Sequence, residues 1–383
     1  MNKVAILIAF ALYGGINYYL FRRSWQALPA NALVHSLFIV LFILFSLSFF
    51  VAMLFGNKLP LSLVTVLENI GSYWVIGLLY FILAALFVDI VRVSNHFVKF
   101  YPDWVYANYP QVKLIALLSV IGLFTLFSLV GNYRFRHPDV RQLNLEIPKG
   151  DGPTGMLTIA VASDVHLGNI IRKDRLKKYV ELLNQQEADI ILFAGDLIDH
   201  SMRPVEERKM DEELRKLKAR YGVYAVFGNH EYYGNVAKAT EFYARSGITL
   251  LRDSAVVIGD RIILAGRDDI SQHLRKPLDV ILSGVTANLP RILLDHNPVR
   301  MDDALRNNID LQLSGHTHNG QIFPLNLIIK GMYPLPYGYL KSGRTNYYVS
   351  SGLGLWAAPV RIGTQSEIVR IKLTLSQSTS QPF

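Results

Sequence analysis

The chain has 383 residues, no cysteine and a formal net charge of +9. The absence of cysteine excludes disulfide bonds, thiolate metal sites and cysteine nucleophiles. Basic residues are spread over both halves of the chain and form no basic stripe, so we expect no nucleic acid partner. Charged residues make up only 18% of the chain and hydrophobic residues 51%, a balance that indicates membrane-spanning segments.

Residues 1–131 are predicted to form a transmembrane region of about four helices. A helix needs about 20 mostly apolar residues to cross a bilayer. Four stretches approach that length: Val4–Phe21, Val34–Gly56, Ser72–Val88 and Leu114–Val130. The alternative, a buried helical core of a soluble domain, is disfavoured because soluble helices show a polar face and these stretches do not.

Two features of this region are left open by the sequence. The first stretch could be a cleaved signal peptide, but the polar segment Tyr18–Trp25 separates it from the candidate cleavage site Ala30–Ala32, which favours a retained span. The positive-inside rule gives no orientation, because each side of a four-span region carries five basic residues.

A transporter is disfavoured because no charged residue lies in the middle of a stretch.

The composition changes near Gly131. Residues 132–155 are polar and rich in Arg, Pro and Gly, which predicts a linker. Residues 156–374 alternate short apolar runs with amphipathic ones, which predicts an α/β domain, and residues 375–383 form a polar tail. Strands are expected at Met156–Ala162, Ile190–Ala194, Val223–Phe227, Ile262–Ala265, Ile292–Leu294, Leu311–Leu313, Tyr347–Val349 and Ile368–Leu373. Helices are expected at Asp174–Gln185, Pro204–Arg220, Val236–Ser246 and Val299–Asn307.

Five of the expected strands end directly before residues that can bind metal ions. The sequences that follow are Asp-Val-His at 164–166, Gly-Asp at 195–196, Gly-Asn-His-Glu at 228–231, Asp-His-Asn-Pro at 295–298 and Gly-His-Thr-His at 315–318. Ligands bind beyond the carboxyl ends of strands in α/β sheets, so these segments can converge on one site. Carboxylate, imidazole and amide ligands without thiolate suit Mn, Fe or Zn. Gly195, Gly228 and Gly315 are expected to let the backbone turn sharply before each ligand.

In this order the five segments resemble the calcineurin-like metallophosphoesterase superfamily, over about residues 156–373. Residues 293–298 and 315–321 are most similar to a membrane-associated bacterial branch, which includes phosphodiesterases and enzymes that cleave the pyrophosphate of UDP-diacylglucosamine. The resemblance implies a four-layer α/β/β/α sandwich with two metal ions. The implied ligands are Asp164, His166 and His318 for the first metal, Asn229, His296 and His316 for the second, and Asp196 as a bridge between them. His230 is implied as the general acid.

The chemistry of phosphoester cleavage explains why such a site needs these residues. Two metal ions neutralise the anionic ester and hold the attacking and departing oxygens in line. They also lower the pKa of bound water, so that a metal-bridging hydroxide is available near neutral pH. His230 beside the leaving oxygen would then donate a proton, which contributes roughly 10²–10⁴-fold to the rate.

Residues outside the metal pattern are given supporting roles. Asp199 is expected to orient a site histidine from outside the metal shell, and Glu231 either to do the same or to cap a turn. The apolar segment Ile322–Leu340 is broken by Pro and Gly, and is either a loop packed on its own domain or a lipid-facing lip for an amphiphilic substrate. The histidines without partners in the pattern are treated as non-catalytic: His35, His96, His137, His200 and His273.

The predicted function is a membrane-anchored hydrolase of phosphodiester or pyrophosphate bonds, and the predicted spans suggest a lipid-linked substrate. A phosphatase for soluble monoesters or phosphoproteins is a second hypothesis. A third, of another class, is a non-catalytic membrane sensor or scaffold on the same fold, which is disfavoured because every ligand of the pattern is present. The expected location is the cell membrane, with several passes and the side of the catalytic domain undetermined.

Overall fold

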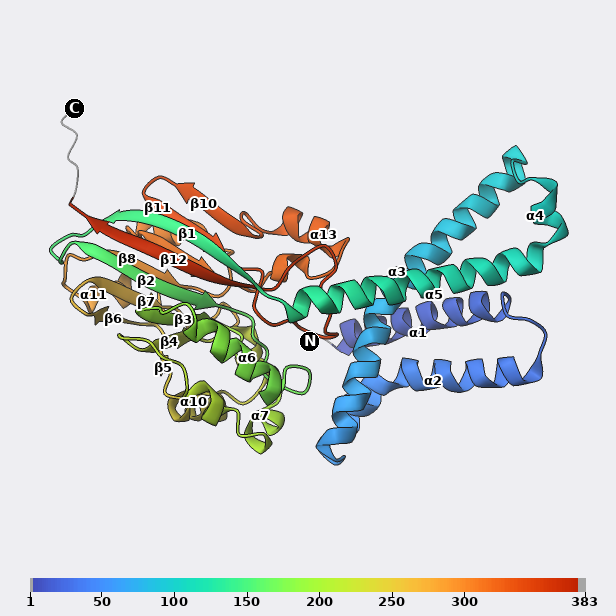
Figure 1. Ribbon diagram of the computed structural model, residues 1–383, viewed down its shortest axis with the longest axis horizontal. Helices are drawn as coiled ribbons and strands as arrows, with labels where there is room; N and C mark the ends of the chain where they lie inside the picture. The colour runs from blue at the N-terminus through green and yellow to red at the C-terminus, as the bar shows by residue number, and fades with distance from the viewer. Residues whose placement is uncertain (1–2, 378–383) are drawn as a thin grey trace. The chain divides into compact units, whose positions relative to one another are not determined.

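The computed structural model describes residues 3–377, which belong to two compact units, Met1–Leu129 and Val130–Phe383 (Figure 1). Most of the predicted polar tail, residues 378–383, lies outside the described residues. In its described part, the regular structure of the first unit is helical. Its helices are α1 (Lys3–Trp25), α2 (Ala32–Phe55), α3 (Leu61–Val98), α4 (Asp103–Ala107) and the first part of α5 (Tyr109–Arg136).

Within residues 3–377, three helices are long and apolar enough to cross a membrane, namely α2, α3 and α5. The prediction of four spans is therefore corrected to three. The first expected span does form helix α1, but its uninterrupted apolar run ends at Leu12. Arg22 and Arg23 lie in its last turn, so it offers fewer apolar residues than the 20 or so that a bilayer requires. The other three expected spans lie within the three helices, apart from Gly56, which directly follows α2.

The second unit contains two six-stranded sheets (Figure 1). The first sheet consists, in spatial order, of β1 (Asp139–Pro148), β12 (Glu367–Ser376), β2 (Gly155–Ala162), β3 (Ile190–Ala194), β4 (Val223–Val226) and β5 (Thr249–Leu250). The second consists of β10 (Gly338–Ser342), β11 (Thr345–Val349), β9 (Leu311–Ser314), β8 (Arg291–Leu294), β7 (Ile262–Gly266) and β6 (Ser254–Ile258). All eight predicted strands are present, with ends shifted by a few residues at most.

Strand β2 shows how the two sheets are held together. Leu157, Ile159 and Val161 lie in a buried cluster that also contains side chains of the second sheet. Ala160 and Ala162 belong instead to the cluster on the outer face of the first sheet. Because successive side chains of a strand point to opposite faces, a strand buried on both faces reads as a continuous apolar run. This explains why the central strands could be recognised from sequence.

Helices cover the outer faces of both sheets and complete four layers. Helix α6 buries Leu176, Tyr179, Val180 and Leu183, a spacing that places them on one helical face. The helices of this unit are α6 (Lys173–Asn184), α7 (Arg203–Glu207), α8 (Asp211–Leu214), α9 (Asn229–Tyr233), α10 (Val236–Arg245), α11 (Leu278–Ser283), α12 (Met301–Arg306), the 3₁₀ turn η1 (His318–Gly320) and α13 (Leu325–Met332).

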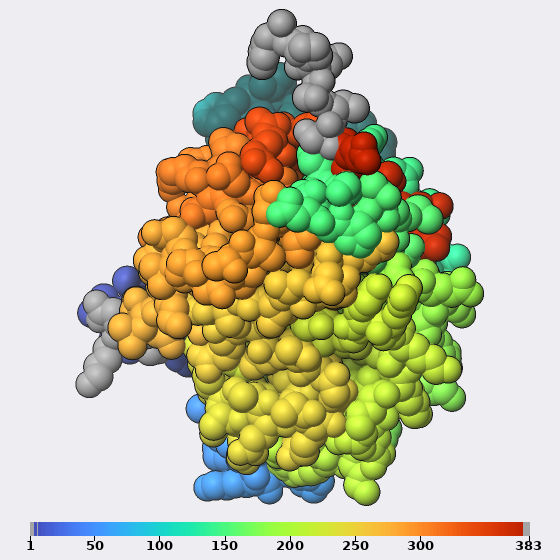
Figure 2. All heavy atoms as spheres, turned by 90° about the vertical axis from the view of Figure 1, so that its left-hand side faces the viewer, coloured from blue at the N-terminus to red at the C-terminus, as the bar shows by residue number. Residues whose placement is uncertain are grey.

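The segment predicted as a linker, residues 132–155, contains the end of α5 and strand β1. Strand β1 pairs in parallel with β12 over its whole length, with Leu145 opposite Leu373. Its apolar residues Leu143, Leu145 and Ile147 alternate with polar ones, which is the pattern of a half-buried strand rather than of a linker. Figure 2 shows one face of the unit, on which a green segment near residue 150 lies beside orange and yellow segments, and Asn288 donates to Asp151 at 3.2 Å.

Two further segments differ from expectation. The helix predicted at Pro204–Arg220 is divided into the short helices α7 and α8, because Lys209 between them has a positive φ of 47° and ends the first helix. The segment Ile322–Leu340, expected to be irregular, contains α13 and the start of β10. Pro324 precedes α13 and Gly331 lies next to its last residue, so neither interrupts the helix.

We expect Ile159→Ala to destabilise the second unit. Ile159 is fully buried between the sheets, and loss of such a side chain costs about 2–5 kcal/mol of unfolding free energy. Thermal unfolding of the purified protein in detergent, followed by fluorescence, should show a lower midpoint. Met156→Ala, at the exposed start of the same strand, is the control and should leave the midpoint unchanged. Equal shifts for both variants would contradict the assigned core.

Candidate metal centre

Strand ends from both sheets supply the candidate site. In the first sheet the neighbouring parallel strands β2, β3 and β4 are followed by Asp164, Asp196 and Asn229. In the second sheet the parallel pair β8 and β9 is followed by His296 and His316. All five loops lie at carboxyl ends of strands, where the side chains of an α/β sheet converge on a ligand. The seven residues predicted as metal ligands are linked to one another by direct contacts.

The first group of ligand atoms comes from Asp164, His166 and His318. These three residues are buried and can offer donor atoms that all lie within 4.8 Å of one another. His166 Nε2 lies 3.1 Å from His318 Nε2, and the latter lies 3.3 Å from Asp164 Oδ1. The backbone N–H of His316 donates to both carboxylate oxygens of Asp164, at 3.0 and 3.2 Å. The carboxylate is thereby fixed against the loop that carries two other predicted ligands.

The second group of contacts joins Asp196, Asn229, His296 and His316. Asp196 Oδ2 lies 3.3 Å from His296 Nε2, and Asp164, Asp196 and His296 form another buried set of three potential ligands. Asn229 Oδ1 lies 3.3 Å from His296 Nε2 and 2.8 Å from His316 Nδ1. The other nitrogen of His296, Nδ1, donates to the carbonyl oxygen of Ala194 at 2.8 Å. This hydrogen bond places a proton on Nδ1, so Nε2 is the nitrogen that faces the site.

His230 lies beside these groups and contacts Asp199. Its Nδ1 is 2.9 Å from Asp199 Oδ1, and its backbone N–H donates to Asp196 Oδ1 at 2.9 Å. Asp199 is half-buried, and its Oδ1 also lies 2.6 Å from His200 Nδ1 and 3.8 Å from His166 Nδ1. Asp199 thus contacts three imidazoles. One of them is His200, which had no partner in the sequence pattern.

The three glycines before the ligands make room for ligand side chains. A Cβ at Gly195 would lie 2.4 Å from His296 Nδ1, and a Cβ at Gly228 would lie 2.1 Å from Asp196 Oδ1. At Gly315 it would lie 2.3 Å from an oxygen of Asp164. Only Gly195 of these has a positive φ, at 92°. These glycines were expected to allow sharp turns of the backbone. At all three positions, however, glycine is needed because the side chain of a candidate metal ligand lies too close for a Cβ atom.

Burial and mutual contact shift the pKa values of the metal-free site. Burial alone would raise the pKa of Asp196, but the positive charges of His296 and His166 outweigh it and lower that pKa. Burial and the neighbouring His166 lower the pKa of His318 well below its usual value. Burial likewise lowers the pKa of His316, with His296 as the next cause. An ionised carboxylate and neutral imidazoles are the forms that bind metal ions.

Glu231 joins two of the ligand loops. One carboxylate oxygen accepts the backbone N–H of Ile198 at 2.9 Å and the hydroxyl of Tyr243 at 3.0 Å. The other oxygen accepts the N–H of Gly228 at 2.8 Å. Burial, followed by the charge of Asp196, raises the pKa of Glu231 to about 7. These contacts tie the loop that follows β3 to the loop that follows β4.

Arg361 was not predicted as a site residue, but it holds the loop of residues 351–354 that packs against Asp164. Its guanidinium is fully buried and donates to three carbonyl oxygens of residues 351–354, at 2.6–3.0 Å. The N–H of Gly354 donates to the Asp164 carbonyl at 3.0 Å, and a Cβ at Gly354 would lie 2.0 Å from the Val165 carbonyl oxygen. The glycine pattern Ser-Gly-Leu-Gly-Leu at 351–355 was the available signal. It marks a loop packed against a ligand strand end.

The chemistry of the donor set fits divalent metal ions. Two carboxylates, four imidazoles and one amide oxygen meet at a buried point, and two sets of three donors have the spacing of a metal site. Nδ1 of His166 and Nδ1 of His318 are buried and make no hydrogen bond within the described residues. A buried cluster of carboxylates, imidazoles and an amide oxygen is stabilised by divalent cations. The chain therefore has potential ligands for divalent metal ions, as the sequence predicted.

Comparison with known proteins agrees with this geometry. Residues 157–320 match the calcineurin-like phosphoesterase family. A metallophosphoesterase of Helicobacter pylori is 30% identical over 377 residues, which cover 97% of this chain and 98% of that protein. A zebrafish (Danio rerio) transmembrane protein with a metallophosphoesterase domain is 36% identical over 277 residues, which cover 68% of this chain and 62% of that protein. The metallophosphoesterase YkuE of Bacillus subtilis is 34% identical over 219 residues, or 54% of this chain and 75% of that protein.

The chain belongs to the calcineurin-like metallophosphoesterases. It is a metal-dependent phosphoesterase and, with its three candidate spans and a relative named as a transmembrane protein, a membrane protein. The resemblance seen in the sequence is thus confirmed at the level of the family and of the enzyme class.

We expect Gly228→Ala to abolish metal binding and activity. The added Cβ would occupy the position next to Asp196 Oδ1, and a displacement of about 1 Å at such a site costs on the order of 100-fold in rate. Metal content by mass spectrometry and hydrolysis of a chromogenic phosphoester measure the effect. Gly284→Ala is the matched control, because its Cβ would lie 3.8 Å from the nearest atom. Full activity in the Gly228 variant would contradict the assigned site.

Proposed function

We propose that this protein hydrolyses phosphodiester or pyrophosphate bonds in a lipid-linked substrate, as a multi-pass protein of the cell membrane with two divalent metal ions. The observation that carries the proposal is the convergence of the seven predicted ligands at the strand ends of both sheets. The catalytic domain, expected over residues 156–374, would also include strand β1, because β1 is part of the first sheet.

Asp164, His166 and His318 would hold one ion, Asn229, His296 and His316 the other, and Asp196 would hold both. When bound, Mn, Fe or Zn ions would offset the charge of the phosphoester and lower the pKa of a water molecule. The contacts of Asp196 support its bridging role, because it follows a strand of the first sheet and contacts His296 of the second.

His230 would protonate the leaving oxygen. Its Nδ1 lies 2.9 Å from Asp199 Oδ1, so the carboxylate accepts the Nδ1 proton and fixes the plane of the ring. The side chain is 14% exposed, in contrast to the fully buried His296, so substrate can reach it. A carboxylate in this position orients a catalytic imidazole. Asp199 would therefore act through His230 and contact no substrate itself.

The lipid-linked substrate is supported by the segment that follows the last predicted ligand. Phe323, Leu327, Ile328 and Met332 in and before α13 are each at least half exposed. The ring of Tyr333, next after α13, lies 6.0 Å from the ring of His316. An exposed apolar surface beside a phosphoesterase site would bind the apolar part of an amphiphilic substrate. A phosphatase for soluble substrates would gain nothing from it.

Two substitutions separate metal binding from proton donation. Asp196→Asn should remove both metal and turnover, because the bridging charge is lost. His230→Ala should retain metal but lower kcat by about 10²–10⁴-fold, and by less with a nitrophenyl leaving group that needs no proton. Metal analysis and kinetics on both substrate types make the comparison, with the exposed His273→Ala as control. Activity that survives both changes would show that the site assignment is wrong.

The substrate class is tested by removing the exposed apolar side chains of α13. Leu327→Ser with Ile328→Ser should raise KM for a lipid phosphodiester in mixed micelles by about tenfold or more, because apolar burial is lost. Hydrolysis of a water-soluble diester should not change. Val280→Ser, an exposed apolar residue of α11, is the control. A protein that cleaves soluble diesters well and ignores lipid substrates would overturn the lipid proposal.

A further inference from the structure

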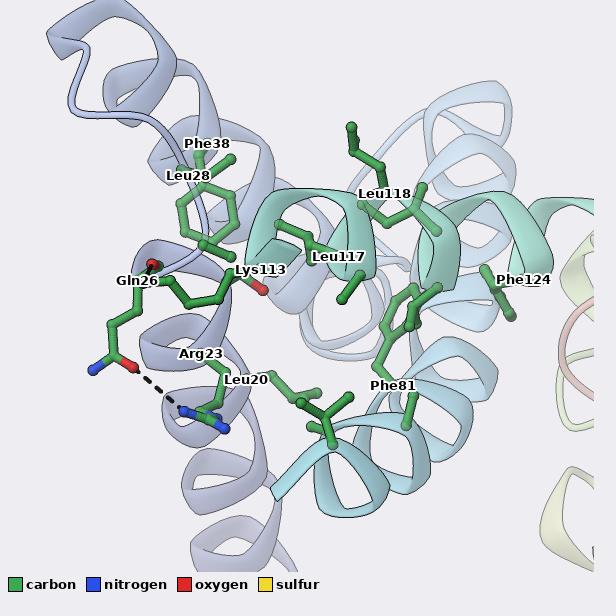
Figure 3. Close-up of a pocket in the computed structure, with 18 of the residues that line it drawn as sticks. Leu20, Arg23, Gln26, Leu28, Phe38, Phe81, Lys113, Leu117, Leu118 and Phe124 are labelled. Atoms are coloured by element: carbon green, nitrogen blue, oxygen red, sulfur yellow. Dashed lines mark hydrogen bonds between the residues drawn. The ribbon is translucent and has the colours of Figure 1, made fainter. Parts of the chain in front are cut away.

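The helical unit of residues 1–129 encloses a cavity of about 1090 Å³ (Figure 3). Ligand pockets commonly measure about 300–1,000 Å³, so this one has room for a long apolar ligand. Its lining is dominated by leucines and aromatic side chains, among them Phe38, Phe81 and Phe124. A cavity of this kind, in helices that cross a bilayer, has the surface chemistry of acyl chains.

One end of the cavity is cationic. Arg23, Arg92 and Lys113 line the cavity, whereas the described residues that line it include no aspartate or glutamate. Figure 3 shows Arg23, Gln26 and Lys113 together at one end and Phe81 and Phe124 at the other. Arg92 also lines a smaller cavity of about 560 Å³ that shares Tyr101 and Tyr109 with the first. The cavity therefore has a polar, positively charged end and an apolar body.

The cations are held in place by contacts between helix ends. Lys113, near the start of α5, donates to the backbone carbonyl of Gln26 just beyond α1, at 2.7 Å, and lies 5.4 Å above the Tyr109 ring. Arg23 lies 3.5 Å from Gln26 Oε1 and forms an ion pair with Asp89 of α3. Asp89 also accepts the hydroxyl of Tyr19 at 2.5 Å. The pairing of Asp89 with Arg23 leaves Arg92 for an external anion.

We propose that this cavity binds a phospholipid with an anionic headgroup, whose phosphate is bound by Lys113 and Arg92 and whose acyl chains fill the apolar body. Arginine and lysine bind phosphate by charge-assisted hydrogen bonds, and each basic residue near a membrane surface favours anionic lipid. A zwitterionic lipid would fill the apolar body equally well, but its headgroup would not match an excess of positive charge. The site is formed by residues of the first unit alone and does not depend on the proposed reaction.

Quenching of Trp74 tests the proposal, because Trp74 lines the cavity. The full-length protein is placed in nanodiscs of phosphatidylcholine that contain increasing amounts of brominated phosphatidylglycerol or brominated phosphatidylcholine. The difference between the fluorescence of the wild type and that of Trp74→Phe isolates the Trp74 signal. We expect the anionic lipid to quench half of the Trp74 signal at a mole fraction at least about fivefold lower than the zwitterionic lipid requires. Fivefold is the preference that a single basic residue in contact with the headgroup would give.

The matched variants are Lys113→Gln and Arg92→Gln against Arg22→Gln, which removes a neighbouring arginine that does not line the cavity. Each of the first two should reduce the anionic preference about fivefold, and Arg22→Gln should leave it unchanged. Retained hydrolysis of a soluble phosphoester shows that a variant is folded.

Equal quenching by the two lipids would overturn the proposal and show that the cavity holds bilayer lipid of any type. An equal loss of the preference for anionic lipid in all three variants would show that the total positive charge of the protein causes the preference. That result would also overturn the proposal. Relief of quenching by millimolar inorganic phosphate would show that the cationic end binds a soluble anion instead.

Discussion

The contact between Asp196 and His296 joins the two sheets of the catalytic unit at their carboxyl ends. Asp196 follows β3 of the first sheet, and its carboxylate lies 3.3 Å from the imidazole of His296, which follows β8 of the second. The same carboxylate accepts the backbone N–H of His230 at 2.9 Å. Gly228 packs so closely against it that no other residue would fit. The position of this one side chain therefore fixes the spacing of three ligand loops.

Burial of so many titratable groups at one point would destabilise an ordinary protein core. A buried charge is tolerated only when it is paired, hydrogen-bonded or bound to a metal ion. Here the first two means are used: the imidazoles offset the carboxylates, and backbone N–H groups donate to Asp164 and Asp196. Glu231 and Arg361 hold the surrounding loops without entering the donor cluster. The arrangement keeps the ligands in place before any ion binds, which is the preorganisation that a metal site needs.

The central strands, and the positions of the candidate ligands at strand ends, could be predicted from the sequence because both are local signals. A strand buried on both faces is a continuous apolar run, and a polar ligand directly after it marks the strand end. Strand β1 was not predicted, because polar residues and prolines dominate the composition of its segment. One face of β1 becomes buried only when β1 pairs with β12, which lies more than 220 residues later in the chain. Arg361 and the packing of Gly228 against Asp196 depend on contacts between distant segments. The partners in such contacts cannot be found from a local pattern. The prediction for α1 was correct for the helix and wrong only for the membrane span, because the apolar part of the helix is too short.

The short connection between membrane helix and catalytic sheet bears on how a lipid substrate would be recognised. Helix α5 ends at Arg136 and β1 begins at Asp139, and the end of α5 is part of the catalytic unit, since Gly131 accepts the N–H of Arg361 at 3.0 Å. A tether of this kind raises the effective concentration of any ligand that resides in the membrane, without new contacts. The exposed apolar residues of α13 then need to supply only modest affinity, because the search for substrate takes place within the tethered volume. Under the proposed function, the small exposed surface of α13 would therefore be sufficient for a lipid substrate, although it would be weak in a freely diffusing enzyme.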